Sequence, residues 1–410
     1  MESRSNTMSR KNAARACCSV FSLVAVTLSG CRAHDFPQYA PNYREYAYVT
    51  NGGSGTVTVL DVVDVRLERE LPVGQNPVAV AASPTRNEVY VVNSGGAGGM
   101  GSISVVNAEN NTVAATIPLH RQPVSIEIDA KGELAYVANS GSNSISVIDL
   151  KSRREVALVG AGEEPVAARL TPDGKTLVVA NRKGNSVSLF DSAALRVRAV
   201  FAGCPGASDV AILPDSSKAF VSCSAGHQVM AIALARASQP ASPQAGAGQG
   251  GGSPATPALP DRLEALMDVG RSPVQLALKP DGGEVFVLNS LSDSVSEVIT
   301  GTDDVQGAYM MGDNPASGLV SGDNSVLYVG NLRSQNVIIY GIDYGRIVGS
   351  VHVGDGPSAM AFSAAGNLLF VADARSGDVA VVRTASQSLF TLLPAGRAPN
   401  AIVDKAFKLP

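Results

Sequence analysis

The sequence has no tryptophan, only four histidines and only five cysteines among 410 residues. It contains no Cys-x-x-Cys-His motif, which excludes covalent haem attachment. The histidines stand apart from one another, whereas a metal site needs three or four clustered ligands. No Gly-x-Ser-x-Gly motif leads from a strand into a helix, as a hydrolase nucleophile would require. Local motifs therefore predict no catalytic residue, no metal ligand and no cofactor, and whether the protein is an enzyme stays open.

Long apolar stretches are also missing, except near the N terminus. The apolar run from Ala16 to Leu28 follows four basic residues and is shorter than the roughly 20 residues that span a bilayer. It ends in Leu28-Ser29-Gly30-Cys31, which resembles a bacterial lipoprotein cleavage box. We therefore expect a lipoprotein signal peptide over residues 1–30, lipidation at Cys31, and a tether over residues 31–45. A plain secretory signal with a chance cysteine is the alternative.

Lipidation would place the protein in the bacterial cell envelope, because several acyl chains hold a protein stably on a membrane. Arg32 follows the cysteine, and no Asp there signals inner-membrane retention, so we expect an outer-membrane anchor facing the periplasm or the surface. Removing residues 1–30 takes away four of the 32 basic and one of the 36 acidic residues, which leaves a net charge of −7. An acidic surface argues against nucleic acid as a partner.

A short unit recurs along the chain with a fixed period. In the unit from Leu134 to Asp149 the first strand ends at Asn139, and the equivalent strand ends are 42 residues apart in five of seven steps; the other two steps are longer by 4 and by 24 residues. A four-stranded propeller blade needs about 40–45 residues. The eight strand ends are Asn51, Asn93, Asn139, Asn181, Cys223, Asn289, Asn331 and Asp373.

A Gly-x-x-Pro element accompanies each unit, as in Gly162/Pro165. Two copies depart from it: His120 takes the glycine position before Pro123, and Pro205 comes one place early after Gly203. Within the repeat 123–161 alternation of β-branched residues predicts four strands. Their ranges are Pro123–Asp129, Leu134–Asn139, Ser144–Asp149 and about Glu155–Val159.

This pattern resembles the YVTN family of β-propeller repeats, whose defining strand stands here as Tyr48-Val49-Thr50-Asn51. The resemblance covers residues 46–407, and the lack of tryptophan separates the chain from WD40 propellers. We expect an all-β fold, a single propeller domain over residues 46–410 with eight four-stranded blades; seven blades, common in the family, are the alternative. The lone last strand, Pro399–Phe407, is expected to pair with the first blade and close the ring.

The insertion of 24 residues, at about 237–260, is rich in Gly, Pro, Ser and Gln. Such a composition cannot bury a core, so this segment is expected to be disordered. The glycine-rich loop from Gly95 to Gly101 lacks the lysine and the following helix of a phosphate-binding loop.

One face of a propeller carries both the Gly-x-x-Pro elements and the strand-end asparagines, and ring-shaped proteins usually bind partners there. Arginines and carboxylates on this rim could hold an anionic or peptide ligand; a solvated, self-compensating ring of charge is the alternative. The repeated Asn is interpreted as a turn former. The candidate rim residues are His120, Arg121, Gln122, Glu163, Glu164, Arg271, Asp313, Asn314, Asp355 and Arg397.

Cys204 and Cys223 remain after the signal and Cys31 are set aside. Both are expected on the rim face of one blade in an oxidising compartment, so a disulfide is compatible with the pattern. Two free buried thiols are equally compatible.

Three functions follow from these patterns. The first is a lipid-anchored, monomeric binding scaffold for a protein, peptide or cell-wall component. The second is an enzyme, since propellers resembling this one include lactonase-type hydrolases and the haem d1 domain of nitrite reductases. The third is a surface-layer or adhesion component.

Overall fold

The computed structural model describes residues 37–235 and 259–409. The chain forms two units, Met1–Pro41 and Asn42–Pro410, and the described residues 37–41 of the first contain no strand or helix. The expected signal peptide, Cys31 and the expected disordered insertion at about 237–260 fall wholly or almost wholly outside the described residues. Within them, no helix is long and apolar enough to cross a membrane.

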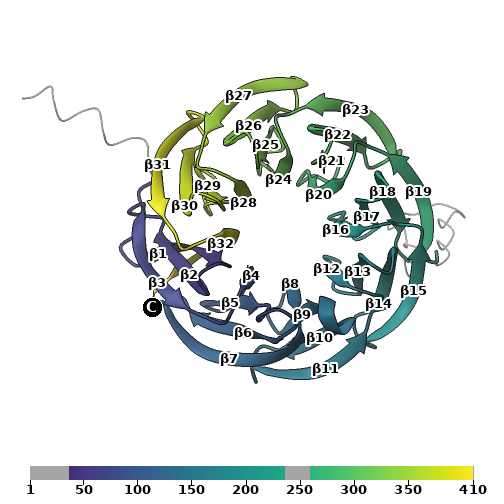
Figure 1. Cartoon of the computed structure of the whole chain (residues 1–410), viewed down its shortest axis with the longest axis horizontal. Coiled ribbons are helices and arrows are strands. Elements are labelled where there is room, and N and C mark those ends of the chain that lie inside the picture. Colours follow the sequence, from purple (N-terminus) through teal and green to yellow (C-terminus); the bar gives the residue numbers. More distant parts are fainter. Residues whose placement is uncertain (1–36, 236–258, 410) are drawn as a thin grey trace, which may run out of the picture. The chain divides into compact units, whose positions relative to one another are not determined.

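The second unit is a ring of eight four-stranded antiparallel sheets, which confirms the eight-bladed propeller and rules out seven blades (Figure 1). We name the strands of each blade A to D from the central channel outwards. The first blade, in the order A to D, has β32 (Pro399–Lys408), β1 (Tyr43–Asn51), β2 (Thr56–Asp61) and β3 (Arg66–Pro72). The second has β4 (Pro77–Ala82), β5 (Glu88–Asn93), β6 (Met100–Asn107) and β7 (Thr112–Arg121). The third has β8 (Pro123–Ile128), β9 (Leu134–Asn139), β10 (Ser144–Asp149) and β11 (Arg154–Gly160), with the 3-10 turn η1 (Ser140–Ser142) between β9 and β10. The fourth has β12 (Pro165–Leu170), β13 (Thr176–Asn181), β14 (Ser186–Asp191) and β15 (Arg196–Ala202).

The other four blades follow the same order. The fifth has β16 (Ala207–Ile212), β17 (Lys218–Cys223), β18 (Gln228–Ala233) and β19 (Arg262–Asp268). The sixth has β20 (Pro273–Leu278), β21 (Glu284–Asn289), β22 (Ser294–Ile299) and β23 (Asp304–Met310). The seventh has β24 (Pro315–Val320), β25 (Val326–Asn331), β26 (Asn336–Gly341) and β27 (Arg346–His352). The eighth has β28 (Pro357–Phe362), β29 (Leu368–Asp373), β30 (Asp378–Arg383) and β31 (Ser388–Pro394).

The core lies between neighbouring blades, where the faces of two sheets meet. Strands B and C are buried on both faces, as in β13 and β14, and their valines, isoleucines and alanines pack against strands of the next blade. Strands D are buried at few positions, as in β15. A sheet that is covered on both faces favours runs of β-branched residues over strict alternation.

The C-terminal strand closes the ring, as expected. β32 pairs antiparallel with β1, from Tyr43 opposite Lys408 to Asn51 opposite Pro399. β1 begins at Tyr43, before the expected start of the propeller at Tyr46, because β32 extends to Lys408 and offers partners to these earlier residues. The closure pairs the inner edge of β1, which would otherwise be the open edge of a three-stranded sheet.

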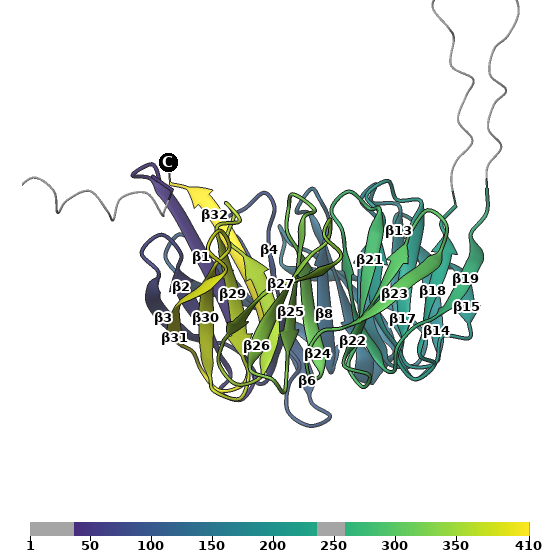
Figure 2. The same cartoon turned by 90° about the horizontal axis from the view of Figure 1, so that it is seen from above.

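The loops divide between two faces. The D–A and B–C loops lie along the lower edge of Figure 2, which includes the long loop before β6, and the A–B and C–D turns lie along its upper edge. We call the first face the rim face and the second the turn face.

Candidate functional site

The strand-end asparagines hold the loops of the rim face. In the fourth blade Asn181 is fully buried, and its Nδ2 donates a hydrogen bond of 2.9 Å to Ser188 Oγ on strand C. A Cβ atom added to Gly162 would lie 2.6 Å from Cγ of Asn181, so only glycine fits there. The same contact joins Gly74 to Asn93, Gly270 to Asn289, Gly312 to Asn331 and Gly396 to Asn51.

The interpretation of this asparagine as a turn former was therefore incomplete. Its side chain joins strand C to the D–A loop, and the repeated Gly and the repeated Asn are two halves of one contact. This explains why both recur with the same 42-residue period.

Backbone hydrogen bonds join the D–A loop to the B–C loop in every blade. In the fourth blade Glu164 has a positive φ of 54°, and its carbonyl oxygen accepts from Arg182 N at 2.9 Å. Glu163 O accepts from Gly184 N at 3.0 Å. The backbone of the variable pair is thus fixed, and the blades differ in side chains. The equivalent positions with positive φ are Asn76, Gln122, Gly206, Ser272, Asn314, Gly356 and Ala398.

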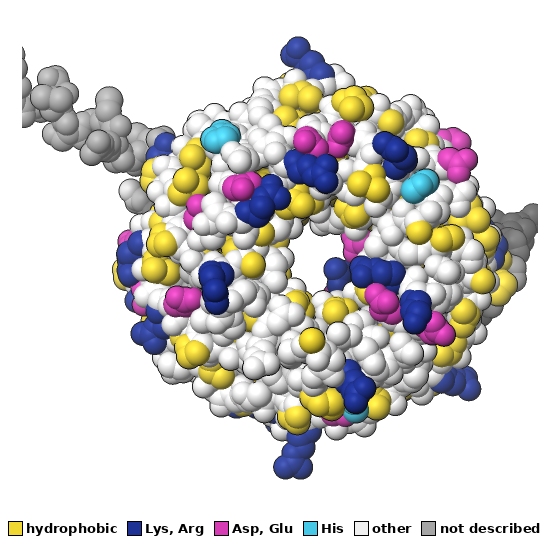
Figure 3. All heavy atoms as spheres, in the orientation of Figure 1, with side chains coloured by type: hydrophobic (Ala, Val, Ile, Leu, Met, Phe, Trp, Pro, Cys, Tyr) yellow, Lys and Arg dark blue, Asp and Glu magenta, His cyan; other side chains and the backbone are white. Residues whose placement is uncertain are grey.

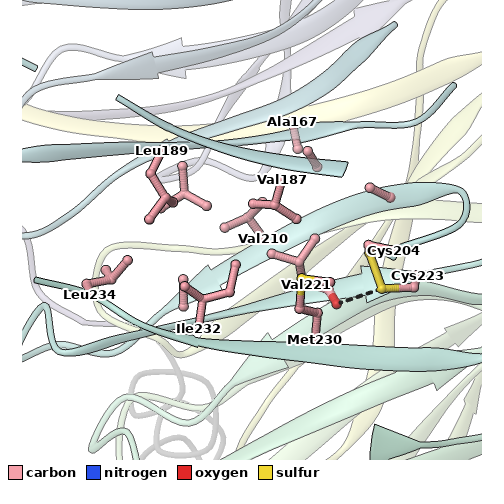
Figure 4. Packing of buried hydrophobic residues seen from close by; sticks show 14 residues of the cluster. Ala167, Val187, Leu189, Cys204, Val210, Val221, Cys223, Met230, Ile232 and Leu234 are labelled. Atoms are coloured by element: carbon pink, nitrogen blue, oxygen red, sulfur yellow. Dashed lines mark hydrogen bonds between the residues drawn. A yellow bond between two sulfur atoms is a disulfide. The ribbon is translucent and has the colours of Figure 1, made fainter. Parts of the chain in front are cut away.

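The fifth blade has a disulfide in place of the Gly–Asn contact. Cys204, in the loop before β16, is bonded to Cys223 at the end of β17. Both residues are fully buried beside Val187 and Val221 (Figure 4). The structure therefore contains a disulfide here, and the two cysteines are not free thiols.

The eighth blade has a pair of carboxyl groups at the same place. Asp373 ends β29 and is fully buried, and its Oδ2 accepts from Gly354 N at 3.0 Å. Burial, followed by the hydrogen bond to Asp378, raises the pKa of Asp373 to about 8. The raised pKa favours a protonated Asp373 at neutral pH, at the place where the seventh blade has a bond from Asn331 to Asn336.

Two of the candidate rim residues lie in a strand instead of a loop. His120 and Arg121 are the last residues of β7, because this strand extends further than the other D strands. His120 Nε2 lies 3.2 Å from Glu155 Oε2, and Arg121 N donates to Ser142 Oγ at 2.9 Å. His120 is thus paired with an outer strand and does not face Glu163 or a shared pocket.

Other rim residues form ion pairs with their own B–C loop. Glu164 lies 3.5 Å from Arg182. Asp355 lies 2.8 Å from Arg375, and the hydrogen bond from Arg375 lowers the pKa of Asp355. The charges of Glu164 and Asp355 are thus compensated locally.

The remaining candidates have their backbones fixed and their side chains at the surface. Arg271 Nη2 donates to Leu291 O at 2.9 Å, and Asn314 N donates to Asp293 Oδ1 at 2.9 Å. Among the described residues, no hydrogen bond or ion pair holds the charged groups of Arg121, Glu163, Asp313 or Arg397. Figure 3 shows that acidic and basic side chains lie near one another at several places around the central opening.

Over residues 37–235 and 259–409, no group of three or more His, Cys, Asp and Glu residues could hold a metal ion. His227 serves the loop structure, since its Nδ1 accepts from Ser272 N at 3.2 Å. The rim residues thus surround the opening without meeting in one pocket.

The central channel contains an ionisable pair that the sequence reasoning missed. Glu127 on β8 lies 3.8 Å from Arg169 on β12, in a pocket of about 420 Å³ that Val80, Ile126 and Val403 also line. Burial raises the pKa of Glu127. The available signal was a charged residue between Ile126 and Ile128 in strand A.

Comparisons with known proteins identify propellers. The profile of the family described as "Lactonase, 7-bladed beta-propeller" matches residues 45–161. This range covers the first three blades, without β32 and without the first two residues of β1. A search of curated proteins finds no significant match.

Solved structures of several activities share the fold. Dihydro-haem d1 dehydrogenase NirN is 14% identical, with a TM-score of 0.68 over 90% of this chain and 76% of that chain. Hydrazine synthase of Kuenenia stuttgartiensis is 23% identical, with a TM-score of 0.54 over 82% and 92%. A putative 6-phosphogluconolactonase of Bacteroides uniformis is 15% identical, with a TM-score of 0.58 over 89% and 100%. At these identities the likeness is one of fold, so the chain is similar to lactonase-type propellers in its first part and to propellers of diverse activity over most of its length.

Proposed function

We propose that this chain is a lipid-anchored binding scaffold of the bacterial cell envelope that holds a protein or peptide partner on its rim face. The observation that carries the proposal is the fixed backbone of the variable pair in all eight blades, as at Glu163 and Glu164. A rigid frame with exchangeable side chains lowers the entropy cost of binding. The lipid anchor at Cys31 and the envelope location rest on the N-terminal sequence pattern alone.

The charge of the rim indicates the chemistry of the partner. Arg121, Arg271 and Arg397 are exposed and come from different blades, so they can contact an acidic segment at separate points around the opening. Guanidinium groups bind carboxylates in bidentate geometry and are enriched at binding hot spots. An acidic protein or peptide segment therefore fits this face better than a cell-wall glycan does.

Charge reversal on the rim tests the proposal. The full chain carrying Arg121→Glu, Arg271→Glu and Arg397→Glu is compared with a control carrying Arg154→Glu, Arg196→Glu and Arg346→Glu. The control arginines are also exposed, but they begin outer strands. We expect crosslinking in native membranes, read by mass spectrometry, to lose its partner in the rim variant alone. Equal crosslinking in both variants contradicts a rim-face scaffold.

A second candidate function is lactone hydrolysis in the central channel. It is supported by the match of residues 45–161 to the lactonase profile and by Glu127, a carboxyl group in the channel whose pKa is raised by burial, as is common for catalytic acids and bases. Arg169 beside it could stabilise a developing negative charge. The test measures hydrolysis of gluconolactone by the purified wild-type chain and by Glu127→Gln. Hydrolysis by the wild type that is lost in Glu127→Gln would favour this function, and equal rates in the two proteins would contradict it.

A further inference from the structure

The turn face contains a pocket of about 630 Å³ between the seventh and eighth blades. It is bounded by the A–B turn of the seventh blade, residues 321–325, by the A–B turn of the eighth, residues 363–366, and by the C–D turn from residue 384 to residue 387. Its volume lies within the range of small-molecule sites in proteins. It is remote from the rim face, so it is independent of the proposed scaffold function.

The pocket exists because two neighbouring turns are not joined. Among the described residues, no hydrogen bond links the seventh-blade turn to the eighth-blade turn, and Ala364 N instead donates to Glu45 Oε1 of the first blade at 2.8 Å. The eighth-blade turn is thus held on its far side, and a gap stays open on its near side. At other junctions such bonds occur: Thr85 Oγ1 to Lys131 O, Asp173 N to Ser216 Oγ, and Asp281 N to Asn324 Oδ1.

The hydroxyl and carboxyl groups of the pocket offer mainly acceptors, and the Gln387 amide adds donors. Asp323 Oδ1 accepts from Ser321 Oγ at 2.6 Å and from Ser325 Oγ at 2.8 Å, and these bonds lower the pKa of Asp323, so it is ionised. Thr384 Oγ1 donates to Gly366 O at 2.8 Å. The hydroxyl protons are therefore used within the protein, and free lone pairs remain for a ligand. No lysine or arginine lines the pocket, which disfavours an anion.

The wall of the pocket is apolar and aromatic. Tyr328 and Phe362 form an edge-to-face pair with ring centroids 5.6 Å apart, and the ring of Phe362 is partly exposed. Val326 and Ala365 extend this wall. A ligand that fits has a C–H face to place against the aromatic side and hydroxyl groups that donate to Asp323.

We propose that this pocket binds a neutral saccharide, one to a few sugar rings long, with Asp323 accepting its hydroxyl protons and Phe362 contacting the apolar face of a ring. An amine would also offer donors to Asp323, but it would leave the aromatic wall without an apolar partner of matching shape.

The test uses the full chain and three saccharide probes, maltotriose, cellotriose and triacetylchitotriose, with spermidine as a comparison amine. Saturation-transfer NMR and calorimetric titration measure binding of each. We expect at least one to bind, and Asp323→Asn to weaken it by at least about tenfold, as loss of a charge-assisted hydrogen bond does. Asp173→Asn is the matched control, because Asp173 accepts from Thr171 Oγ1 at 2.6 Å in the same kind of turn but does not line this pocket.

Ala365→Trp is a second variant. Ala365 is exposed at the edge of the pocket, so a large side chain there fills the pocket without disturbing the core. It should abolish binding while leaving the thermal unfolding midpoint unchanged. The proposal is overturned if none of the three trisaccharides binds, if spermidine binds in their place, or if Asp173→Asn weakens binding as much as Asp323→Asn does.

Discussion

The contact between Gly162 and Asn181 gives the sharpest test of how the rim face is built. In Gly162→Ala the new Cβ would lie 2.6 Å from Cγ and 2.7 Å from Nδ2 of Asn181. Asn181 is fully buried and bonded to Ser188, so it cannot move aside without losing that bond. Overpacking of this kind costs about 1–3 kcal/mol of unfolding free energy.

Gly160→Ala is the matched control, because a Cβ at Gly160 would have nothing within 4 Å. It should change the unfolding free energy by less than about 0.5 kcal/mol. In the double variant Gly162→Ala with Asn181→Ser, the smaller side chain makes room for the new methyl group. Its loss of stability should therefore be smaller than the sum of the two single losses.

Urea unfolding, followed by far-ultraviolet circular dichroism and tyrosine fluorescence, is measured for the wild type and for the four variants Gly160→Ala, Gly162→Ala, Asn181→Ser and the double variant. The chain has no tryptophan and 10 tyrosines, so tyrosine reports on the core. Equal midpoints for Gly160→Ala and Gly162→Ala would refute the proposed Gly–Asn contact, and so would strict additivity in the double variant.

Three further predictions concern the fifth blade, the eighth blade and the closure of the ring. Cys204→Ser breaks the bond to Cys223 across 19 residues and should lower the unfolding free energy by about 3 kcal/mol; an unchanged urea midpoint would show that the disulfide contributes nothing. Burial raises the pKa of Asp373 from 3.8 to about 8. Protonation of Asp373 therefore stabilises the folded state fully below pH 3.8, and this stabilisation is lost as pH rises through about 8. Asp373→Asn should therefore flatten the fall of the melting temperature between pH 4 and pH 8, and a profile parallel to that of the wild type would count against this. Burial, with Glu45 nearby, likewise raises the pKa of Asp404 on β32 to about 8. Because the buried carboxylate is charged at pH 8 but protonated at pH 5, Asp404→Asn should raise the melting temperature more at pH 8 than at pH 5. An equal shift at both pH values would exclude a role for this ionisation in ring closure.

Much of the fold followed from periodicity. The strands predicted in the repeat 123–161 differ from β8 to β11 by no more than one residue at either end, because turns rich in Gly, Asn and Asp separate the strands. The role of the repeated asparagine was not predicted. A sequence shows that Gly162 and Asn181 recur together, but it does not show that one packs on the other.

The sequence assigned the candidate rim residues to the D–A loops, but the partners of their side chains depended on contacts between loops. His120 pairs with Glu155, 35 residues away, and Asp355 pairs with Arg375; several alternative partners were available to each in the sequence. Glu127 was overlooked because a single charged residue in strand A has meaning only once the channel brings Arg169 beside it.

The sequence by itself determined the number of blades, the strands of each blade and the strand that closes the ring, because these depend on local hydrophobic patterning and on a period that the chain repeats. Only the tertiary structure decided which side chains meet: the disulfide of the fifth blade, the buried Asp373 beside Asp378 in the eighth, and the pocket beside Asp323. Those contacts join residues from different turns, and their geometry is set by how the whole ring packs.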